Sequence, residues 1–357
     1  MAPRTLDRPA RGGDRSPRAV VARARRRRAA RVVLVTLGLA GVCATLFCLT
    51  LSFGEVVVPL PDVMRTLLGT GNGGSGFIIN QLRLPRALVG IMVGSAFGIS
   101  GAIFQTLLRN PLASPDIIGI SAGASAAAVV AVLWLDLGGY AVSAAAFAGA
   151  LATAAMIYTL AWRDGVTGYR LVLVGIAMAA VMTSVVSYSL TRAEVYAAYE
   201  ALVWLTGSLN ATTWPTVRVL GTTVAVLVPL ALLAGRWLRA LQLGDDAARA
   251  LGASVQACRL GLLVAAVALA AVATAAAGPV AFVAFFSGPI ARQLVGNNGV
   301  ALVPAAFVGA VVVLASDFVA QHALESVQLP VGVVTAMIGA PYLLWLLATT
   351  NRVGRGG

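Results

Sequence analysis

Long apolar runs separated by short polar breaks dominate this chain. They lie at roughly 32–53, 87–108, 117–135, 140–161, 171–191, 217–235, 260–277, 279–295, 300–321 and 331–348. A helix needs about 20 such residues to cross the hydrocarbon layer of a membrane. The pattern therefore predicts an all-α polytopic membrane protein with about ten transmembrane helices. The segment 279–295 is the weakest, because Ser287-Gly288-Pro289 interrupts it, and we expect it to be kinked or only partly spanning.

The stretch 83–123 is not built like an ordinary membrane anchor. Its apolar run carries glycines at four-residue spacing, namely Gly90, Gly94 and Gly98, with Gly101 beyond. This spacing places a groove of small residues on one helix face, where other helices or a passing solute can come close. Gln105 lies inside the run and needs a polar partner in hydrocarbon, and the run breaks at Arg109-Asn110-Pro111.

Composition agrees with a membrane protein and removes one class of function. Of 357 residues, 59% are hydrophobic and 11% charged, and all 26 basic residues are arginine. A phosphate-binding P-loop needs a lysine, so this chain cannot hydrolyse nucleotides by that route. The three cysteines, Cys43, Cys48 and Cys258, share no metal-ligand spacing and are interpreted as packing residues.

Arginine counts predict the orientation in the membrane. Residues 1–31 hold eleven arginines against Asp7 and Asp14, which is typical of a disordered basic tail lying near anionic lipid rather than of a nucleic-acid site. With this tail inside and the spans alternating, 21 arginines fall inside and five outside. We therefore expect a cytoplasmic tail at 1–31, a ten-helix domain at 32–350 and a short cytoplasmic tail at 351–357.

Three segments between the spans have the pattern of short helices. Two lie on the predicted outer side, at 59–68 and 199–209, and the second is amphipathic and interfacial. The third, at 244–252, lies on the inner side, where Asp245 or Asp246 can cap the first turn and Gly252 can end the helix. Such a helix suits transmission of force to a soluble partner, and a solvated linker is the alternative.

Three apparent catalytic signals are weak. Gly119-Ile120-Ser121-Ala122-Gly123 matches a nucleophile elbow, but that elbow works between a strand and a helix, and here it opens a membrane segment. His322 is the only histidine, so it cannot form a multi-histidine metal site. Asp317 is the only acid well inside a span; we expect a hydrogen-bonded structural role, with a proton relay as the alternative.

Four ordered motifs resemble one family. The sequence RLPRALVGIMVGSAFGISGAIFQTLLRNPLASPDIIGISAGA at 83–124 resembles the signature of the FecCD family, the permease subunits of ABC importers for ferric siderophores, haem and cobalamin. The segments 243–252, 277–284 and 329–341 resemble its cytoplasmic coupling loop, its Gly-Pro start of the eighth helix and its last span. The resemblance covers about residues 50–350. It departs from the family at Ser287-Gly288-Pro289-Ile290-Ala291-Arg292, where many members have Pro-His or Pro-Gln.

The resemblance implies a type II importer in the bacterial cell membrane, with both termini cytoplasmic. A second permease, identical or different, would complete the pathway. Two ATPase subunits beneath would use ATP and Mg²⁺, a substrate-binding protein would dock above, and this chain itself would bind no cofactor or metal. The implied site residues are Arg83 and Arg86 for docking; Leu243, Gly244, Asp245, Asp246, Ala248, Arg249, Leu251 and Gly252 for the ATPase; and Gly90, Gly94, Gly98, Gly101, Gln105, Asn110 and Pro111 for the pathway.

The cargo we expect is a ferric siderophore, the commonest cargo of the family, with haem and cobalamin as alternatives. An ion-coupled secondary transporter would need titratable groups at mid-membrane, where Asp317 alone qualifies. An intramembrane enzyme would need a catalytic cluster, and Ser121 with a distant His322 is a poor one.

Overall fold

The computed structural model describes residues 17–70, 74–163, 165–296, 299–324 and 328–353, and within these ranges its regular elements are all helical. The helices are α1 (Pro17–Ser52), α2 (Leu60–Leu67), α3 (Gly74–Phe77), η1 (Ile78–Arg83), α4 (Leu84–Leu107), α5 (Ile120–Leu135), α6 (Tyr140–Ala161), α7 (Gly168–Arg192), α8 (Val195–Leu205), α9 (Trp214–Gln242), α10 (Asp245–Ala250), α11 (Val255–Ala277), α12 (Val283–Val295), α13 (Leu302–His322) and α14 (Val331–Val353).

Each of the ten predicted apolar segments is occupied by one helix of this bundle. They are α1, α4, α5, α6, α7, α9, α11, α12, α13 and α14. In the described part of the chain, seven helices are long and apolar enough to cross a membrane by themselves; the apolar parts of α5 and α14 are shorter, and α12 has 13 residues. The predicted all-α, polytopic fold class is confirmed.

The interrupted segment 279–295 forms a short helix, as its composition predicts. Residues 278–282 are not part of α12, and both Gly278 (φ 72°) and Phe282 (φ 65°) lie in the left-handed region. Gly278 is needed for space as well, because a Cβ there would lie 2.6 Å from the Trp204 carbonyl oxygen. At about 1.5 Å per residue, α12 is roughly 20 Å long, shorter than a hydrocarbon layer of about 30 Å.

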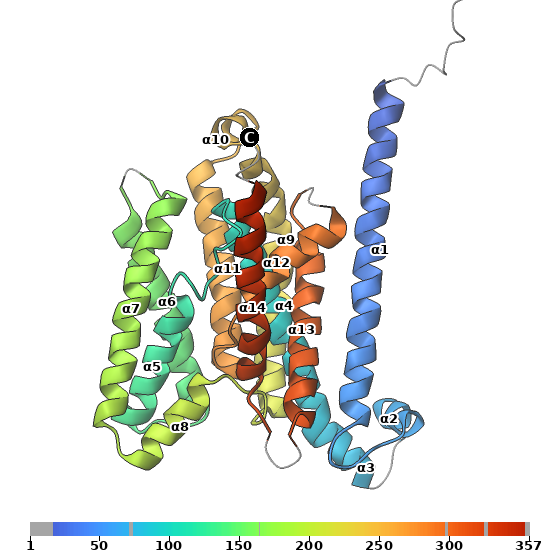
Figure 1. Ribbon diagram of the computed structural model, residues 1–357, viewed down its shortest axis with the longest axis vertical. Helices are drawn as coiled ribbons and strands as arrows, with labels where there is room; N and C mark the ends of the chain where they lie inside the picture. Colours follow the sequence, from blue (N-terminus) through green and yellow to red (C-terminus); the bar gives the residue numbers. More distant parts are fainter. Residues whose placement is uncertain (1–16, 71–73, 164, 297–298, 325–327, 354–357) are drawn as a thin grey trace, which may run out of the picture.

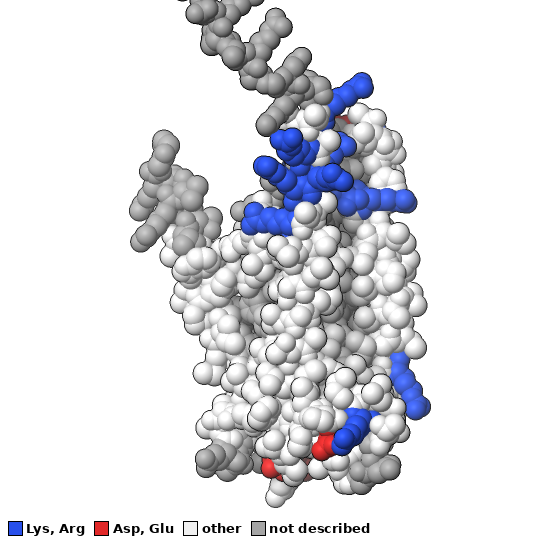
Figure 2. Space-filling model, turned by 90° about the vertical axis from the view of Figure 1, so that its right-hand side faces the viewer, with Lys and Arg blue, Asp and Glu red and all other residues white. Residues whose placement is uncertain are grey.

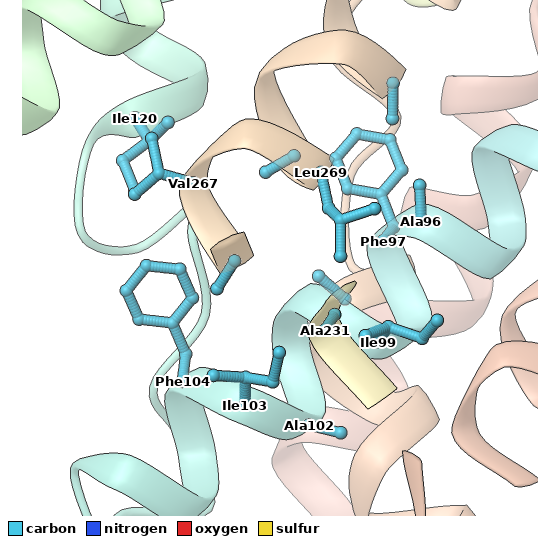
Figure 3. Close-up of a cluster of buried hydrophobic side chains, with 14 of the residues drawn as sticks. Ala96, Phe97, Ile99, Ala102, Ile103, Phe104, Ile120, Ala231, Val267 and Leu269 are labelled. Atoms are coloured by element: carbon cyan, nitrogen blue, oxygen red, sulfur yellow. The ribbon is translucent and has the colours of Figure 1, made fainter. Parts of the chain in front are cut away.

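The centre of the bundle is α4. It contacts α13, α11, α12 and α9, and it is buried along most of its length. Its side chains Ala96, Phe97, Ile99, Ala102, Ile103 and Phe104 meet Ile120 of α5, Ala231 of α9, and Val267 and Leu269 of α11 (Figure 3). The helix that the sequence singles out is therefore the one around which the others pack.

The helices α5 to α8 form a group beside this centre (Figure 1). Within the group α5 contacts α6, α7 and α8, while contacts with α11 through α5 and α6 join the group to the rest. Figure 1 also shows that α10, the start of α1 and the end of α14 lie at one end of the molecule, with α2, α3 and α8 at the other. These ends are called the α10 end and the α8 end below.

The structure corrects the predicted disorder of the basic tail. Helix α1 begins at Pro17, so 17–31 are helical, whereas residues 1–16 lie outside the described residues. Arginine and alanine are among the best helix formers, and extending an existing helix avoids the cost of nucleation. The low hydrophobicity of 17–31 rules out a packed core there, but it does not prevent a helix that continues from a membrane span.

Both short helices predicted on the outer side are present at the α8 end. The prediction at 59–68 corresponds to α2, with Pro61 in its first turn. The prediction at 199–209 corresponds to α8, which starts four residues earlier and ends before Gly207, a residue with φ of 69°. A Cβ at Gly207 would lie 2.6 Å from the Pro279 carbonyl oxygen, so α8 ends where the chain passes closely over the start of the α12 segment.

Candidate functional site

The glycines of α4 lie against other helices of this chain. A Cβ at Gly94 would come within 2.7 Å of the Ala310 Cα on α13, and one at Gly101 within 2.6 Å of the Ala284 carbonyl carbon on α12. Gly98 faces Ala305 in the same way, and Gly90 faces Leu314 and Leu209. Because α13 and α12 cover most of this face, the glycines allow close helix packing within the chain. A role of the four glycines in the pathway stays a prediction.

Gln105 has the polar partner that its position in an apolar span demands. It is buried, and its Nε2 donates a hydrogen bond to the Phe285 carbonyl oxygen at 2.6 Å. Its Oε1 accepts a hydrogen bond from Nη2 of Arg292 at 3.0 Å. Both partners belong to α12, so Gln105 fixes α12 against α4 and holds a partly buried arginine near the α10 end.

Asn110 and Pro111 form the turn that follows α4. The Asn110 side-chain oxygen accepts the Leu112 N–H at 2.9 Å, and the Asn110 carbonyl accepts the Ala113 N–H at 3.1 Å. This closes a local turn, because an asparagine side chain can stand in for a backbone acceptor. Pro111 is exposed. The turn ends α4, and a role in a pathway stays a prediction.

The two predicted docking arginines have partners within the chain. Arg83 donates to the carbonyl oxygens of Leu51 and Ser52 at the end of α1, at 2.8 and 3.1 Å, and also to that of Val56. Arg86 donates from Nε and Nη2 to the Asp317 carboxylate of α13, each at 2.9 Å. Docking through these guanidinium groups would require the binding protein to compete with these contacts.

The Arg86–Asp317 pair is buried and further hydrogen-bonded. Only 11% of the Arg86 side chain and 1% of the Asp317 side chain are exposed. Gln321 donates to Asp317 at 2.8 Å, and Arg86 donates to the Gln328 side chain at 3.3 Å. The structural role expected for Asp317 is thus the one that its contacts support. The predicted topology places Arg86 and Asp317 toward the same face of the membrane, but it does not predict that their two spans pack together, which the structure shows.

The helix α10 and its flanking residues form the predicted coupling loop. Ala248 is fully buried and faces the bundle, whereas Leu243 and Leu251, at either end of the helix, are about two-thirds exposed. Asp246 and Arg249 pair with each other at 2.7 Å on the outer surface. An exposed apolar side chain at each end and a charged face between them form a surface that a soluble partner can cover.

Glycines bound this helix at both ends. Gly244 (φ 107°) and Gly252 (φ 80°) adopt left-handed conformations, and no heavy atom would lie within 4 Å of a Cβ at either position. The prediction that Gly252 ends the helix is confirmed. The predicted aspartate cap is wrong, because no side-chain cap bond is formed at Gly244 and Asp245 instead pairs with Arg259 at 3.2 Å.

The discounted catalytic candidates have local partners. Ser121 donates to the Asp116 carboxylate at 2.5 Å, which joins the start of α5 to the segment before it. The His322 ring stacks on Phe318, with ring centroids 4.3 Å apart, and its Nδ1 lies 2.7 Å from the Phe318 carbonyl oxygen. Among the described residues there is no group of three potential metal-ligating side chains.

Comparison with known proteins places the chain in a family. The sequence pattern of the FecCD transport family matches residues 18–349. This chain belongs to the FecCD transport family.

Similarity to individual FecCD-type proteins extends over nearly the whole chain. The chain is 37% identical to the ferric enterobactin transport system permease protein FepG of Escherichia coli over 322 residues, covering 90% of this chain and 98% of FepG. It is 36% identical over 326 residues to the siderophore transport system permease protein YfhA of Bacillus subtilis, covering 89% and 95%. A solved inward-facing metal-chelate type ABC transporter has the same fold, with a TM-score of 0.79 and 24% identity, over 88% of this chain and 99% of that one.

The FecCD chain also contains polar contacts that sequence reasoning missed. Arg109, which follows α4 and has a φ of 50°, donates from Nη2 to the Leu241 carbonyl oxygen of α9 at 2.9 Å. Arg259 of α11 joins Asp245 to the Val166 carbonyl oxygen, the latter at 3.1 Å. Both arginines lie at the α10 end. Arginine counting predicted their side of the membrane, but the sequence offered no signal for their partners.

Proposed function

We propose that this chain is the transmembrane permease subunit of an ATP-driven ABC importer and that its cargo is a ferric siderophore. Membership of the FecCD transport family supports the importer, and the names of two relatives more than a third identical to it support the cargo. The chain would sit as a multi-pass protein in the bacterial cell membrane, with the α10 end and both termini in the cytoplasm. Haem and cobalamin are the alternative cargoes.

The surface of α10 is the observation that carries this proposal. An ATP-driven importer whose permease has no lysine, and therefore no P-loop, needs a separate ATPase. That ATPase would bring ATP and Mg²⁺ and would need a surface on the permease to bind. Leu243 and Leu251 offer two exposed apolar side chains that flank a short, charged helix. Exposed apolar groups surrounded by polar ones are typical of a protein–protein contact. In this proposal α10 inserts into the ATPase partner.

The remaining partners are proposed by membership of the same family. A second permease, identical or different, would pack beside this chain so that the pathway runs between the two. An extracytoplasmic substrate-binding protein would dock at the α8 end, near Arg83 and Arg86. Both guanidinium groups already donate hydrogen bonds within this chain, so we propose that α2, η1 and α8 contribute much of the docking surface. Anionic lipid would surround the basic start of α1.

An ion-coupled carrier is disfavoured by the state of Asp317. A proton-binding carboxylate must exchange protons with water, whereas Asp317 is buried and bound by Arg86 and Gln321. We expect Asp317→Asn to retain ATP-dependent uptake, since asparagine keeps one acceptor oxygen. If uptake by the unmodified chain depended on a proton gradient and Asp317→Asn abolished that uptake, the carrier would be favoured instead.

Co-purification from the native membrane tests the importer directly. The chain should bring down a subunit that hydrolyses ATP, and the double variant Leu243→Asp, Leu251→Asp should lose it, because two carboxylates would have to be buried in the contact. The matched control is Leu68→Asp, a comparably exposed leucine that follows α2 at the α8 end. If the unmodified chain, the double variant and the Leu68→Asp control all recovered equal ATPase activity, the assignment of α10 as the ATPase contact would be refuted. A lone chain that moves its solute under a proton gradient would refute the importer.

A further inference from the structure

The helix α10 has little to hold it to the rest of the bundle. It has six residues, open space surrounds the glycines at both ends, and Asp246 and Arg249 bond to each other. In the described part of the chain, the polar side-chain contact from α10 to another helix is the one between Asp245 and Arg259. A displacement of α10 therefore reaches the membrane helices through the backbone on either side, which leads to α9 and α11, through the buried Ala248, or through this contact.

Arg259 connects three elements at one point. Its backbone is in the first turns of α11, its Nη2 contacts both Asp245 carboxylate oxygens at 3.2 and 3.3 Å, and its Nη1 donates to the Val166 carbonyl oxygen at 3.1 Å. Val166 lies in the loop between α6 and α7. Next to it, a Cβ at Gly165 would lie 2.6 Å from the Gln256 side chain, so this loop rests directly on α11. The arginine thereby links α10 to the group α5 to α8.

Arg109 makes the corresponding connection to the central helix. It lies two residues after the end of α4, and its Nη2 donates to the carbonyl oxygen of Leu241, in the last turn of α9. The same carbonyl accepts the Gly244 N–H at 3.3 Å, immediately before α10. A left-handed conformation is unfavourable for arginine and persists where surrounding contacts fix it. The bond to Leu241 is such a contact.

We propose that Arg259 and Arg109 are positioning residues that pass the movement of α10 to two separate parts of the bundle. Arg259 passes it to the α6–α7 loop and the group α5 to α8, and Arg109 passes it to α4. This inference rests on the proposed role of α10 as the ATPase contact. It adds that two arginines outside the coupling loop determine whether ATP hydrolysis moves the membrane helices.

The geometry around residue 259 suits an arginine. The planar guanidinium group donates in two directions at once, here to a carboxylate and a backbone carbonyl, whereas a lysine ammonium is a compact charge on a flexible stem. Lysine at 259 can pair with Asp245 but holds the Val166 carbonyl less well. Partly exposed ion pairs add little to stability, so replacing Arg259 should leave the fold intact while changing how movement is transmitted.

The experiment measures substrate imported per ATP hydrolysed by the complete importer in proteoliposomes, with its substrate-binding protein and a ferric siderophore. We expect Arg259→Gln and Arg109→Gln to keep the ATPase bound and its hydrolysis rate within about twofold, while import per ATP falls by about tenfold. Arg259→Lys should lie between Arg259→Gln and the unmodified chain. The control is Arg170→Gln, because Arg170 lies at the same end and bonds the Arg163 carbonyl of the same loop without touching α10.

The outcomes separate this inference from the proposed function. Unchanged import per ATP in both glutamine variants would overturn the inference while leaving α10 as the ATPase contact. If Leu243→Asp, Leu251→Asp left ATPase binding intact, the proposed function would fail first. If Arg259→Gln did not assemble, Asp245→Asn would decide, since it removes the same pair from the other side and leaves the Val166 bond in place. An unchanged amount of substrate imported per ATP in Asp245→Asn would then contradict the role proposed for Arg259.

Discussion

Arg86 and Asp317 show how the chain accommodates charge inside its membrane domain. Both side chains are buried, and removing one would leave the other without its partner in a poorly solvating environment. We expect Arg86→Gln to destabilise the protein by about 3–5 kcal/mol, the usual cost of breaking a buried pair. The double variant Arg86→Gln, Asp317→Asn should recover part of this loss. Thermal unfolding in detergent measures both effects.

The control for this prediction is Arg65→Gln on α2. Arg65 pairs with Asp62 at 3.1 Å, but both side chains are largely exposed, and such pairs contribute little because water and salt screen them. We expect an unchanged unfolding temperature. Equal behaviour of Arg65→Gln and Arg86→Gln would contradict the structural role assigned to the Arg86–Asp317 pair.

Gly94 offers a second test at the scale of one residue. A Cβ there would meet the backbone of Gly309 and Ala310 on α13, which cannot rotate away as a side chain would. We expect Gly94→Ala to push α4 and α13 apart and to cost about 1–3 kcal/mol, as overpacking does. Gly38→Ala on α1, where nothing lies within 4 Å, is the matched control and should unfold at an unchanged or slightly higher temperature. A tolerated Gly94→Ala would argue against the close packing.

At the scale of elements, the sequence predicts features that arise locally and does not predict contacts between helices. Hydropathy predicts the ten apolar helices because each one must satisfy its own backbone in lipid. The glycines and charges at 244–252 predict α10 because they act locally. The partners of Asp245, Gln105 and Arg86 could not be predicted in this way, since they depend on which helices pack together. The helical state of 17–31 was missed because composition reports on core formation rather than on the extension of a neighbouring helix.

The basic extension of α1 carries a prediction at the same scale. Arginines surround the helix on all sides over 17–31, and Figure 2 shows them gathered toward the α10 end. An arginine on every side does not fit a helix lying in the membrane plane, but it fits an upright helix among anionic headgroups. In nanodiscs, raising the fraction of phosphatidylglycerol should raise the unfolding temperature, and this gain should vanish when Arg23, Arg25, Arg26 and Arg27 become Gln.

The matched control removes the same charge elsewhere at the α10 end. Changing Arg163, Arg170, Arg236 and Arg239 to Gln should leave most of the phosphatidylglycerol effect in place. High salt should suppress the effect in the unmodified chain, because exposed charges are screened beyond about 10 Å at 0.1 M. An equal loss in both variants would show that net charge, rather than the α1 extension, attracts the lipid.

At the scale of the whole molecule, the outer helices present apolar side chains along much of their length. Leu173 and Ile176 on α7, Leu230 and Leu233 on α9, and Met337 and Leu344 on α14 are all more than half exposed. In a membrane, apolar surfaces of this kind can face lipid, and under the proposed function they can also face a second permease. The centre formed by α4, α11, α12 and α13 is closed by this chain's own packing. Under the proposed function, we therefore expect a pathway shared with a second permease to run along the outer helices.

The unequal ends of the molecule predict its orientation. The predicted topology assigns 21 arginines to the side of α10 and five to the other, so the positive-inside rule predicts that α10 faces the cytoplasm. In intact cells, a chain with Cys43, Cys48 and Cys258 replaced by serine should react with a membrane-impermeant maleimide at Asn210→Cys, an exposed position after α8. Ala250→Cys at the end of α10 should react only after the cells are opened. The reverse labelling would invert the topology and would remove α10 from reach of any cytoplasmic ATPase, so this one measurement also bears on the function proposed for the whole chain.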